Sequence, residues 1–202
     1  MMNKTKHVIA ACLTLIAVAC TPEAKQTDQV KQPEQTKQTE QVQETEADRG
    51  AEILRPLKKE LQQALLAGMQ QGPLIAISVC KEQAPAIAES LSINGVAVGR
   101  TSHRLRNPAN VAPAWVNTVL QSYLEEGSER APEVVRLAGN RHGYVEPILL
   151  QPLCATCHGK TLAPDVAAYI KEAYPADQAT GFEVGDLRGV YWVEYPAAAV
   201  PL

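Results

Sequence analysis

The spacing of apolar and polar residues predicts a helix over residues 51–71. Its large apolar residues recur every four positions, at Ile53, Leu57, Leu61 and Leu65. This is the repeat of one helix face, and charged and amide side chains fill the positions between. Pro56 falls near the start, where a first turn tolerates proline, and Gly72-Pro73 ends the segment.

A mixture of short strands and helices is predicted for the rest of the chain. The mostly apolar run at residues 74–80 (LIAISVC) predicts a short buried strand, and residues 82–92 return to helical spacing before the turn at Asn94-Gly95. Further strands are predicted at 96–102, 143–150 and 189–195, and a further helix at 113–125. Since strands and helices do not alternate regularly, we expect an α+β domain with an antiparallel sheet.

The N-terminus has the pattern of an export signal. Lys4 and Lys6 precede the uncharged apolar residues 8–19, a run too short to span a bilayer comfortably. The run ends in Ala17-Val18-Ala19-Cys20, which resembles a bacterial lipobox. We therefore expect residues 1–19 to be a signal peptide.

A lipid anchor and a tether are expected next. Several acyl chains on Cys20 would hold the protein stably at a membrane, in the periplasm, and Thr21 after it favours the outer membrane by resemblance to Gram-negative lipoproteins. Residues 20–50 are mostly Gln, Glu, Thr and Lys, which predicts a disordered tether. The folded domain is accordingly expected at residues 51–202.

Composition narrows the class of partner. The 202 residues are 46% hydrophobic, enough for one domain with its own core, and the formal net charge is −3. Only one Phe and two Trp are present, and no basic stripe with interleaved aromatic residues is seen. Nucleic acid is therefore not expected as a partner.

Cys154-Ala155-Thr156-Cys157-His158 is a C-x-x-C-H motif, the sequence that attaches haem c. Its two thiols lie about one helical turn apart, so both can reach the vinyl groups on one porphyrin edge. His158 follows directly and is placed to ligate the iron. Attachment takes place in an exported compartment, which the N-terminal signal indicates independently. The motif predicts one covalently bound haem c.

Three other interpretations of the cysteines compete. A C-x-x-C disulfide centre needs no following histidine and usually lies in a thioredoxin-like βαβ context. A zinc site could recruit Cys80 with Cys154 and Cys157, although adjacent Cys157 and His158 fit one tetrahedron poorly. A structural disulfide is the third. Haem is favoured over all three because motif and compartment agree.

The second axial position of the iron has four candidate ligands, Cys80, His103, His142 and Met69. Cys80 is the odd cysteine once Cys20 is lipidated and the motif pair is used, which marks it for attention. A small buried hydrophobe explains it equally well. His103 and His142 are expected at the surface or beside a ligand, and Met69 in the core.

Several short blocks occur in an order shared with a known family. They are residues 76–80 (AISVC), 99–102 (GRTS), 106–110 (RNPAN), 153–159 (LCATCHG), Tyr174-Pro175, Asp177, Ala179, Gly181 and 185–189 (GDLRG). In these blocks residues 51–195 resemble the PAS-like c-type haem domain family, known from a cyanobacterial cytochrome and from sensor regions of bacterial signalling proteins. The resemblance implies a PAS-like antiparallel sheet with flanking helices, preceded by an N-terminal helix.

The resemblance also implies a distal ligand. In that family a cysteine at the end of an early strand ligates the iron opposite the motif histidine, and Cys80 matches it. Thiolate stabilises ferric iron and lowers the reduction potential. The implied function is one-electron transfer or redox sensing with an unknown redox partner. The alternatives are a CO or NO sensor that binds the gas once reduction releases Cys80, and a haem enzyme with an open distal site.

An enzyme is the less favoured alternative, because His103 and His142 are the only evident acid–base candidates. The haem propionates need partners, and arginine is the usual partner of carboxylates. Of Arg100, Arg104, Arg106 and Arg188, the two predicted to bind the cofactor are Arg106 and Arg188, which lie in the family blocks 106–110 and 185–189.

Overall fold

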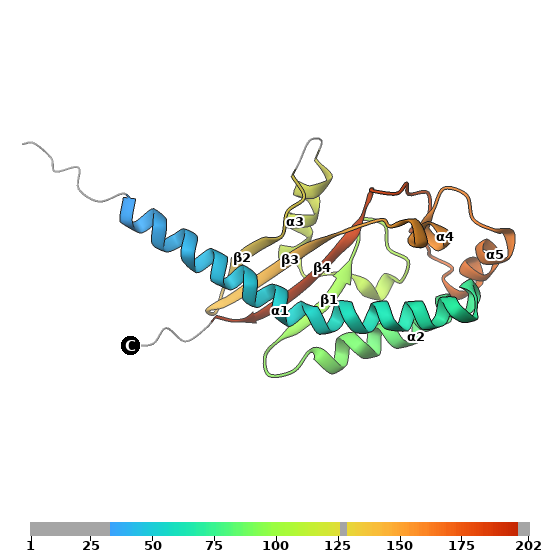
Figure 1. Cartoon of the computed structure of the whole chain (residues 1–202), viewed down its shortest axis with the longest axis horizontal. Helices are drawn as coiled ribbons and strands as arrows, with labels where there is room; N and C mark the ends of the chain where they lie inside the picture. The colour runs from blue at the N-terminus through green and yellow to red at the C-terminus, as the bar shows by residue number, and fades with distance from the viewer. Residues whose placement is uncertain (1–32, 126–128, 198–202) are drawn as a thin grey trace, which may run out of the picture.

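Two long helices and a four-stranded sheet make up most of the protein in a computed structural model that describes residues 33–125 and 129–197 (Figure 1). The order is α1 Pro33–Gln71, α2 Pro73–Leu91, β1 Ala97–Thr101, η1 Pro108–Asn110, α3 Ala114–Leu124, β2 Glu133–Leu137, β3 Arg141–Leu149, η2 Pro152–Cys154, α4 Ala155–His158, α5 Pro164–Ala173 and β4 Leu187–Pro196. The predicted signal peptide at 1–19 and the predicted lipidation site Cys20 lie outside the described residues.

The sheet has the strand order β1-β4-β3-β2, and each neighbouring pair is antiparallel. The prediction of an α+β fold with an antiparallel sheet and flanking helices is confirmed. β4 lies centrally and pairs with both β1 and β3, so Arg100 on β1 lies opposite Tyr191 on β4. This pairing places Arg100 and Tyr191 side by side on the part of the sheet that borders the candidate site.

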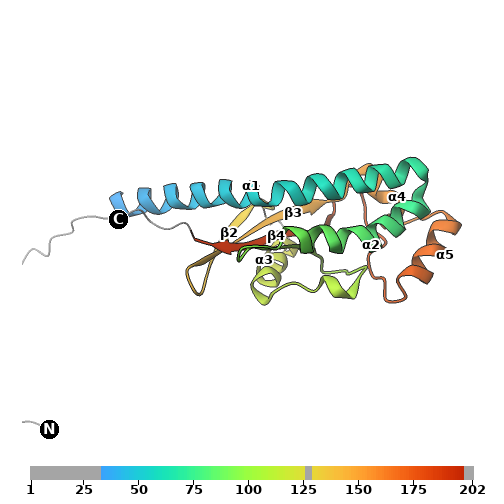
Figure 2. The same ribbon diagram turned by 90° about the horizontal axis from the view of Figure 1, so that it is seen from below.

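The two faces of the sheet pack against different helices (Figure 2). Strand residues alternate between the two faces, so Tyr144 packs with α1 and α2 whereas its neighbour Val145 packs with α3. The first core joins Leu54, Leu57, Leu61, Ala84, Val98, Tyr144, Val193 and Tyr195. The second joins Ala112, Val116, Val119, Leu120, Tyr123, Val145, Leu187 and Val190.

Helix α1 begins before the predicted start of the domain. It starts at Pro33, so residues 33–50 are helical where a disordered tether was expected. Tyr195 donates a hydrogen bond of 2.6 Å to the Glu46 carbonyl, and Glu46 is only 7% exposed. Once the packed segment has nucleated the helix, extending it by further residues costs little free energy. The composition of residues 33–50 does not reveal this packing.

Pro56 lies inside α1 and not in its first turn. Proline in a helix interior costs about 3 kcal/mol or more, because it removes a hydrogen bond and crowds the preceding turn. Leu54 and Leu57, on either side, are 0% and 1% exposed. Burying each contributes about 1.5–3 kcal/mol, so packing carries the helix through the proline.

The predicted strand at residues 74–80 is wrong. These residues form the first part of α2, which runs without a break from Pro73 to Leu91. A short apolar run without a period does not distinguish a buried strand from a buried helix. Close packing against α1 decides for the helix, since a Cβ on Gly68 would lie 2.8 Å from the Ala76 Cα atom. Cys80 is therefore a helix residue and does not end a strand.

The strands predicted at 96–102, 143–150 and 189–195 and the helix predicted at 113–125 are found within two residues at each end, as β1, β3, β4 and α3. The sequence analysis missed β2, α5 and the short α4. β2 has only five residues and none of them is fully buried, so its alternation is weak. No helix in the described part of the chain is both long and apolar enough to cross a membrane.

The packing of α1 on the sheet gives a stability prediction. Replacing buried Leu54 with alanine is expected to lower the free energy of unfolding by about 2–5 kcal/mol, because it leaves a cavity against Tyr144 and Tyr195. Leu66 is on the same helix but 43% exposed, so Leu66→Ala should cost less than about 0.5 kcal/mol. Urea unfolding of both variants is the measurement, and equal losses would contradict the packing described.

Candidate functional site

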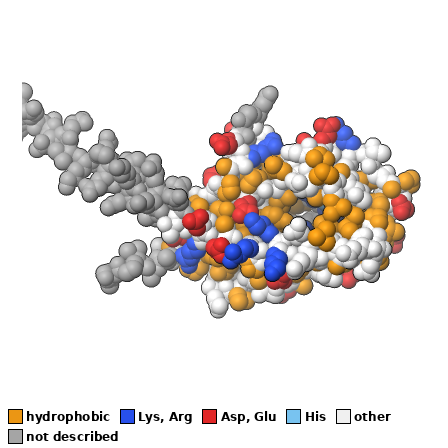
Figure 3. Space-filling view, viewed as in Figure 1, with side chains coloured by type: hydrophobic (Ala, Val, Ile, Leu, Met, Phe, Trp, Pro, Cys, Tyr) orange, Lys and Arg blue, Asp and Glu red, His pale blue; other side chains and the backbone are white. Residues whose placement is uncertain are grey.

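A cavity of about 420 Å³ lies where α1, α2, β1 and β4 meet the motif segment. Its size is within the range of sites for small molecules and cofactors. Hydrophobic side chains gather on this half of the molecule around a hollow in the surface (Figure 3). The residues predicted for the site all line it, namely Cys80, Arg106, Cys154, Cys157, His158 and Arg188. The cavity thus brings together residues that are far apart in the sequence, from Cys80 to Arg188.

The motif folds as one short helical segment. Cys154 ends the 3-10 turn η2, and the following four residues form α4. Both cysteines are free thiols, as is Cys80. Cys157 packs against the cluster of α2 and α5 residues that includes Ile77 and Ile170, and burial raises the pKa of its thiol. The spacing of the two thiols along one helical turn is the one that the motif predicted.

Gly159 fixes the end of the motif. A Cβ atom at this position would lie 2.5 Å from the Ala155 carbonyl oxygen, so no larger residue fits without a shift. The Gly181 N–H donates to the Gly159 carbonyl at 2.9 Å, and the Phe182 N–H donates to the His158 carbonyl at 3.0 Å. The strand-like segment before β4 therefore holds the motif from behind.

The His158 ring is held in one tautomer. Its Nδ1 lies 2.6 Å from the Ala179 carbonyl oxygen, which can only accept, so Nδ1 carries the proton. The Arg188 Nε atom, 3.2 Å from Nδ1, then has no lone pair to donate to. Burial, with Arg188 and Arg106 nearby, lowers the pKa of His158 to about 2. The ring stays neutral and keeps the lone pair of Nε2 for a metal.

Two of the four candidate distal ligands line the cavity with His158. Cys80 lies three positions after Ile77 and four before Ala84, on the α2 face that borders the cavity. Met69, in the last turn of α1, lines the same cavity, so it is not only a core residue. Both are half-buried.

The other two histidines do not line the cavity. His103 packs edge-on against Phe182, with ring centroids 5.8 Å apart, and its pKa is lowered by burial and by Arg104 and Arg188. His142 is buried at the start of β3, with Nδ1 3.1 Å from a Glu46 carboxylate oxygen. The sequence analysis expected His142 at the surface or beside a ligand of the iron. Its buried position, outside the cavity lining, agrees with neither.

Arg106 lines the cavity but is bound to the protein. Its Nε donates to Asp177 Oδ1 at 3.0 Å, and its Nη2 donates to the Cys157 carbonyl at 2.5 Å. Sequence order gave no sign of this pairing, because Arg106 and Asp177 are 71 positions apart.

Arg188 and Arg100 are the less neutralised cations of the cavity. Arg188 has no carboxylate in ion-pair contact within the described ranges, and burial, with Arg106 and Arg100 nearby, lowers its pKa to about 10. Arg100 also lines the cavity, and no hydrogen bond or ion pair joins its side chain to another described residue. The sequence analysis ranked Arg100 below Arg106, and its place opposite Tyr191 on the sheet is what brings it in.

The residues present fit a haem. Val111, Leu149 and Leu153 line the cavity although they are 68%, 40% and 43% exposed, and a flat apolar macrocycle would cover such side chains. The cavity adds three thiols, a neutral imidazole and three guanidinium groups, one of them paired with a carboxylate. That excess of positive charge matches a ligand with two carboxylates.

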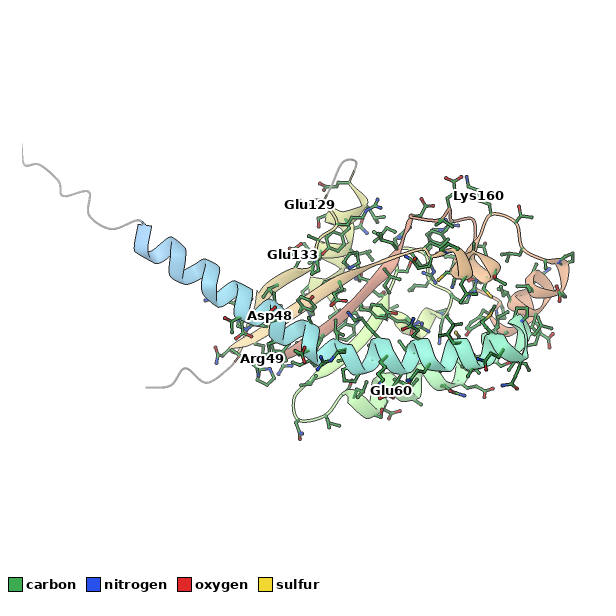
Figure 4. The ribbon with its side chains drawn as sticks, viewed as in Figure 1. Asp48, Arg49, Glu60, Glu129, Glu133 and Lys160 are labelled. Atoms are coloured by element: carbon green, nitrogen blue, oxygen red, sulfur yellow. The ribbon has the colours of Figure 1, made fainter. Side chains whose placement is uncertain are left out.

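The surface beside the motif carries an ion pair. Lys160, two residues after His158, pairs with Glu183 at the surface, well apart from Asp48 and Arg49 on α1 (Figure 4). Among the residues that the structure describes, no three His, Cys, Asp or Glu side chains form a group that could hold a metal ion by themselves.

Comparisons with known proteins give one family and one fold. The family model described as Tll0287-like matches residues 24–196. Among solved structures, the crystal structure of the cyanobacterial heme-protein Tll0287 is similar, with 24% sequence identity and a TM-score of 0.51 over 85% of this chain and 100% of that one. At this identity the likeness concerns the fold. No curated protein matches the chain.

Proposed function

The chain belongs to the Tll0287-like family, and on this premise we propose that it is a c-type cytochrome with one covalently bound haem and a PAS-like fold. A structure similar to it is that of a cyanobacterial heme-protein. The single observation that carries the proposal is the cavity in which Cys154, Cys157 and His158 meet apolar walls and arginine side chains. The four-stranded antiparallel sheet supports a PAS-like domain.

The motif residues attach and ligate the cofactor. Cys154 and Cys157 would hold the haem through two thioether bonds, each thiol adding its sulfur to one carbon of a vinyl group and its hydrogen to the other. His158 presents Nε2, because Nδ1 donates to Ala179. Cys80, on the α2 face bordering the same cavity, is proposed as the opposite ligand, with Met69 as the competing one.

The proposed role is one-electron transfer or redox sensing. Bound haem supplies a ferric/ferrous couple, and a thiolate ligand would keep its reduction potential low. Apolar residues of the cavity wall exclude water from the site. A carrier or sensor is preferred to an enzyme because His103 and His142, the acid–base candidates of the sequence, do not line the cavity.

The proposal is tested on the full chain produced together with haem-maturation machinery. Intact mass of the denatured protein should show one added haem, and a pyridine haemochrome spectrum should be that of haem with two thioether bonds. An unmodified mass and a spectrum without haem bands would refute the proposed function.

The propionates are proposed to meet Arg100 and Arg188. Arg100→Gln is expected to lower the reduction potential by an amount on the order of 59 mV, a tenfold change in the ferrous-to-ferric ratio. The reason is that a nearby positive charge stabilises the less positive ferrous state. Arg136→Gln, on the exposed side of β2, is the matched control. Redox titration is the measurement, and equal shifts in both variants would contradict the placement of Arg100.

We also propose that residues 1–19 are removed and that Cys20 carries the lipid that holds the protein at the periplasmic face of the outer membrane. The lipobox-like Ala17-Val18-Ala19-Cys20 supports this location. Radiolabelled fatty acid should enter the wild-type protein and not a Cys20→Ser variant, and label in both would contradict the proposal.

A further inference from the structure

We propose that Arg106 and Asp177 are positioning residues that fix His158 for the iron, and that Arg106 does not bind a propionate. This inference deepens the proposed function and rests on it. Arg106 was predicted from the sequence as a cofactor-binding residue, so the structure gives the same side chain a different task.

Arg106 joins both backbone segments around the ligand histidine. Its Nη2 donates to the carbonyl of Cys157, the residue before His158, and lies 3.3 Å from the carbonyl of Ala179. The Ala179 carbonyl is the group that accepts from His158 Nδ1. One guanidinium thus holds the motif and the peptide that orients its imidazole.

Asp177 completes the arrangement from the other side. Its Oδ1 accepts from Arg106 Nε and from the Ala179 N–H, each at 3.0 Å. Asp177 thus binds the N–H of Ala179, and Arg106 and His158 both bind its carbonyl oxygen, so all three side chains hold the same residue. The Arg106 and Asp177 side chains are 11% and 10% exposed, and Ala179 is 0% exposed. At such burial, the loss of either charge leaves the other unpaired.

The bonds of Arg106 leave only Nη1 for a propionate. Its Nε and Nη2 are occupied by Asp177 and by two carbonyl oxygens, and Asp177 neutralises its charge. Arg188 is different, since it donates to the Arg104 carbonyl and contacts no carboxylate within the ranges described. Hydrogen bonds to the outer nitrogen of a ligand histidine set the ring orientation and the ligand strength, so the Arg106–Asp177 pair acts on the iron through His158.

The test compares Arg106→Gln, Asp177→Asn and Arg188→Gln with wild type, all haem-loaded full-length chains. EPR g values report the axial ligands, and the propionate bending bands in resonance Raman spectra report hydrogen bonds to the propionates. Arg106→Gln and Asp177→Asn are expected to shift or broaden the EPR signal and leave the propionate bands in place. Arg188→Gln is expected to move the propionate bands.

If Arg106→Gln does not fold, Asp177→Asn still decides the test. Asp177 is a carboxylate and cannot pair with a propionate, so this variant removes no bond to a propionate. The control is Arg136→Gln, which should leave both spectra as in wild type. The inference is overturned if Arg106→Gln moves the propionate bands as Arg188→Gln does, or if Asp177→Asn leaves the EPR signal unchanged. A wild-type chain without haem overturns the proposed function and this inference together, and so differs from either result.

Discussion

A Cys154→Ala/Cys157→Ala double variant is expected to retain no covalently attached haem. Both thiols are free, both line the cavity, and no other thiol lies in the motif segment. Covalent attachment requires a thiol for each vinyl group, so its loss should be complete. Haem staining after a denaturing gel measures this directly, because only covalently bound haem remains with the chain.

Single variants sharpen the result. Cys154→Ala and Cys157→Ala should each keep at most one thioether, which displaces the pyridine haemochrome band from that of wild type. Cys80→Ala is the matched control, since it removes a thiol of the same cavity from α2 and not from the motif. Haem that stays attached to the double variant through denaturation would contradict the assignment of the motif.

A Cys80→Ala variant is expected to lose the low-spin thiolate signature of the ferric protein. Its reduction potential should rise by a few tenths of a volt, within the roughly 0.8 V that axial ligands span in haem proteins. The cause is that thiolate donates electron density and stabilises ferric iron. Optical and EPR spectra, with a redox titration, are the measurements.

Met69 provides the second arm of this experiment, since it lines the same cavity. If Met69 replaces the missing thiolate, the Cys80→Ala spectrum becomes that of a low-spin His/Met site, and the added Met69→Leu change converts it to high spin. If the site stays open, the ferrous Cys80→Ala protein should bind CO. A wild-type-like spectrum in Cys80→Ala would remove Cys80 from the iron and contradict the proposed ligation.

Much of the local structure was predictable because it depends on neighbours in sequence. Helical spacing located α3 and most of α1, and apolar runs bounded by turns located β1, β3 and β4. The run at residues 74–80 was misassigned because a short, mostly apolar segment fits a buried strand as well as a buried helix. In the structure this segment packs as a helix closely against α1, where Gly68 approaches Ala76.

The C-x-x-C-H motif could be recognised from the sequence alone, since its residues lie within about one helical turn and need no partner from elsewhere in the chain. The sequence also placed Cys80 among the candidate ligands. Tertiary structure decided which candidates share a cavity with His158, and it separated Arg106 from Arg100 and Arg188. The physical reason is that an arginine acts according to the carboxylates and carbonyls within reach, and for Arg106 these are brought near by folding from 71 positions away.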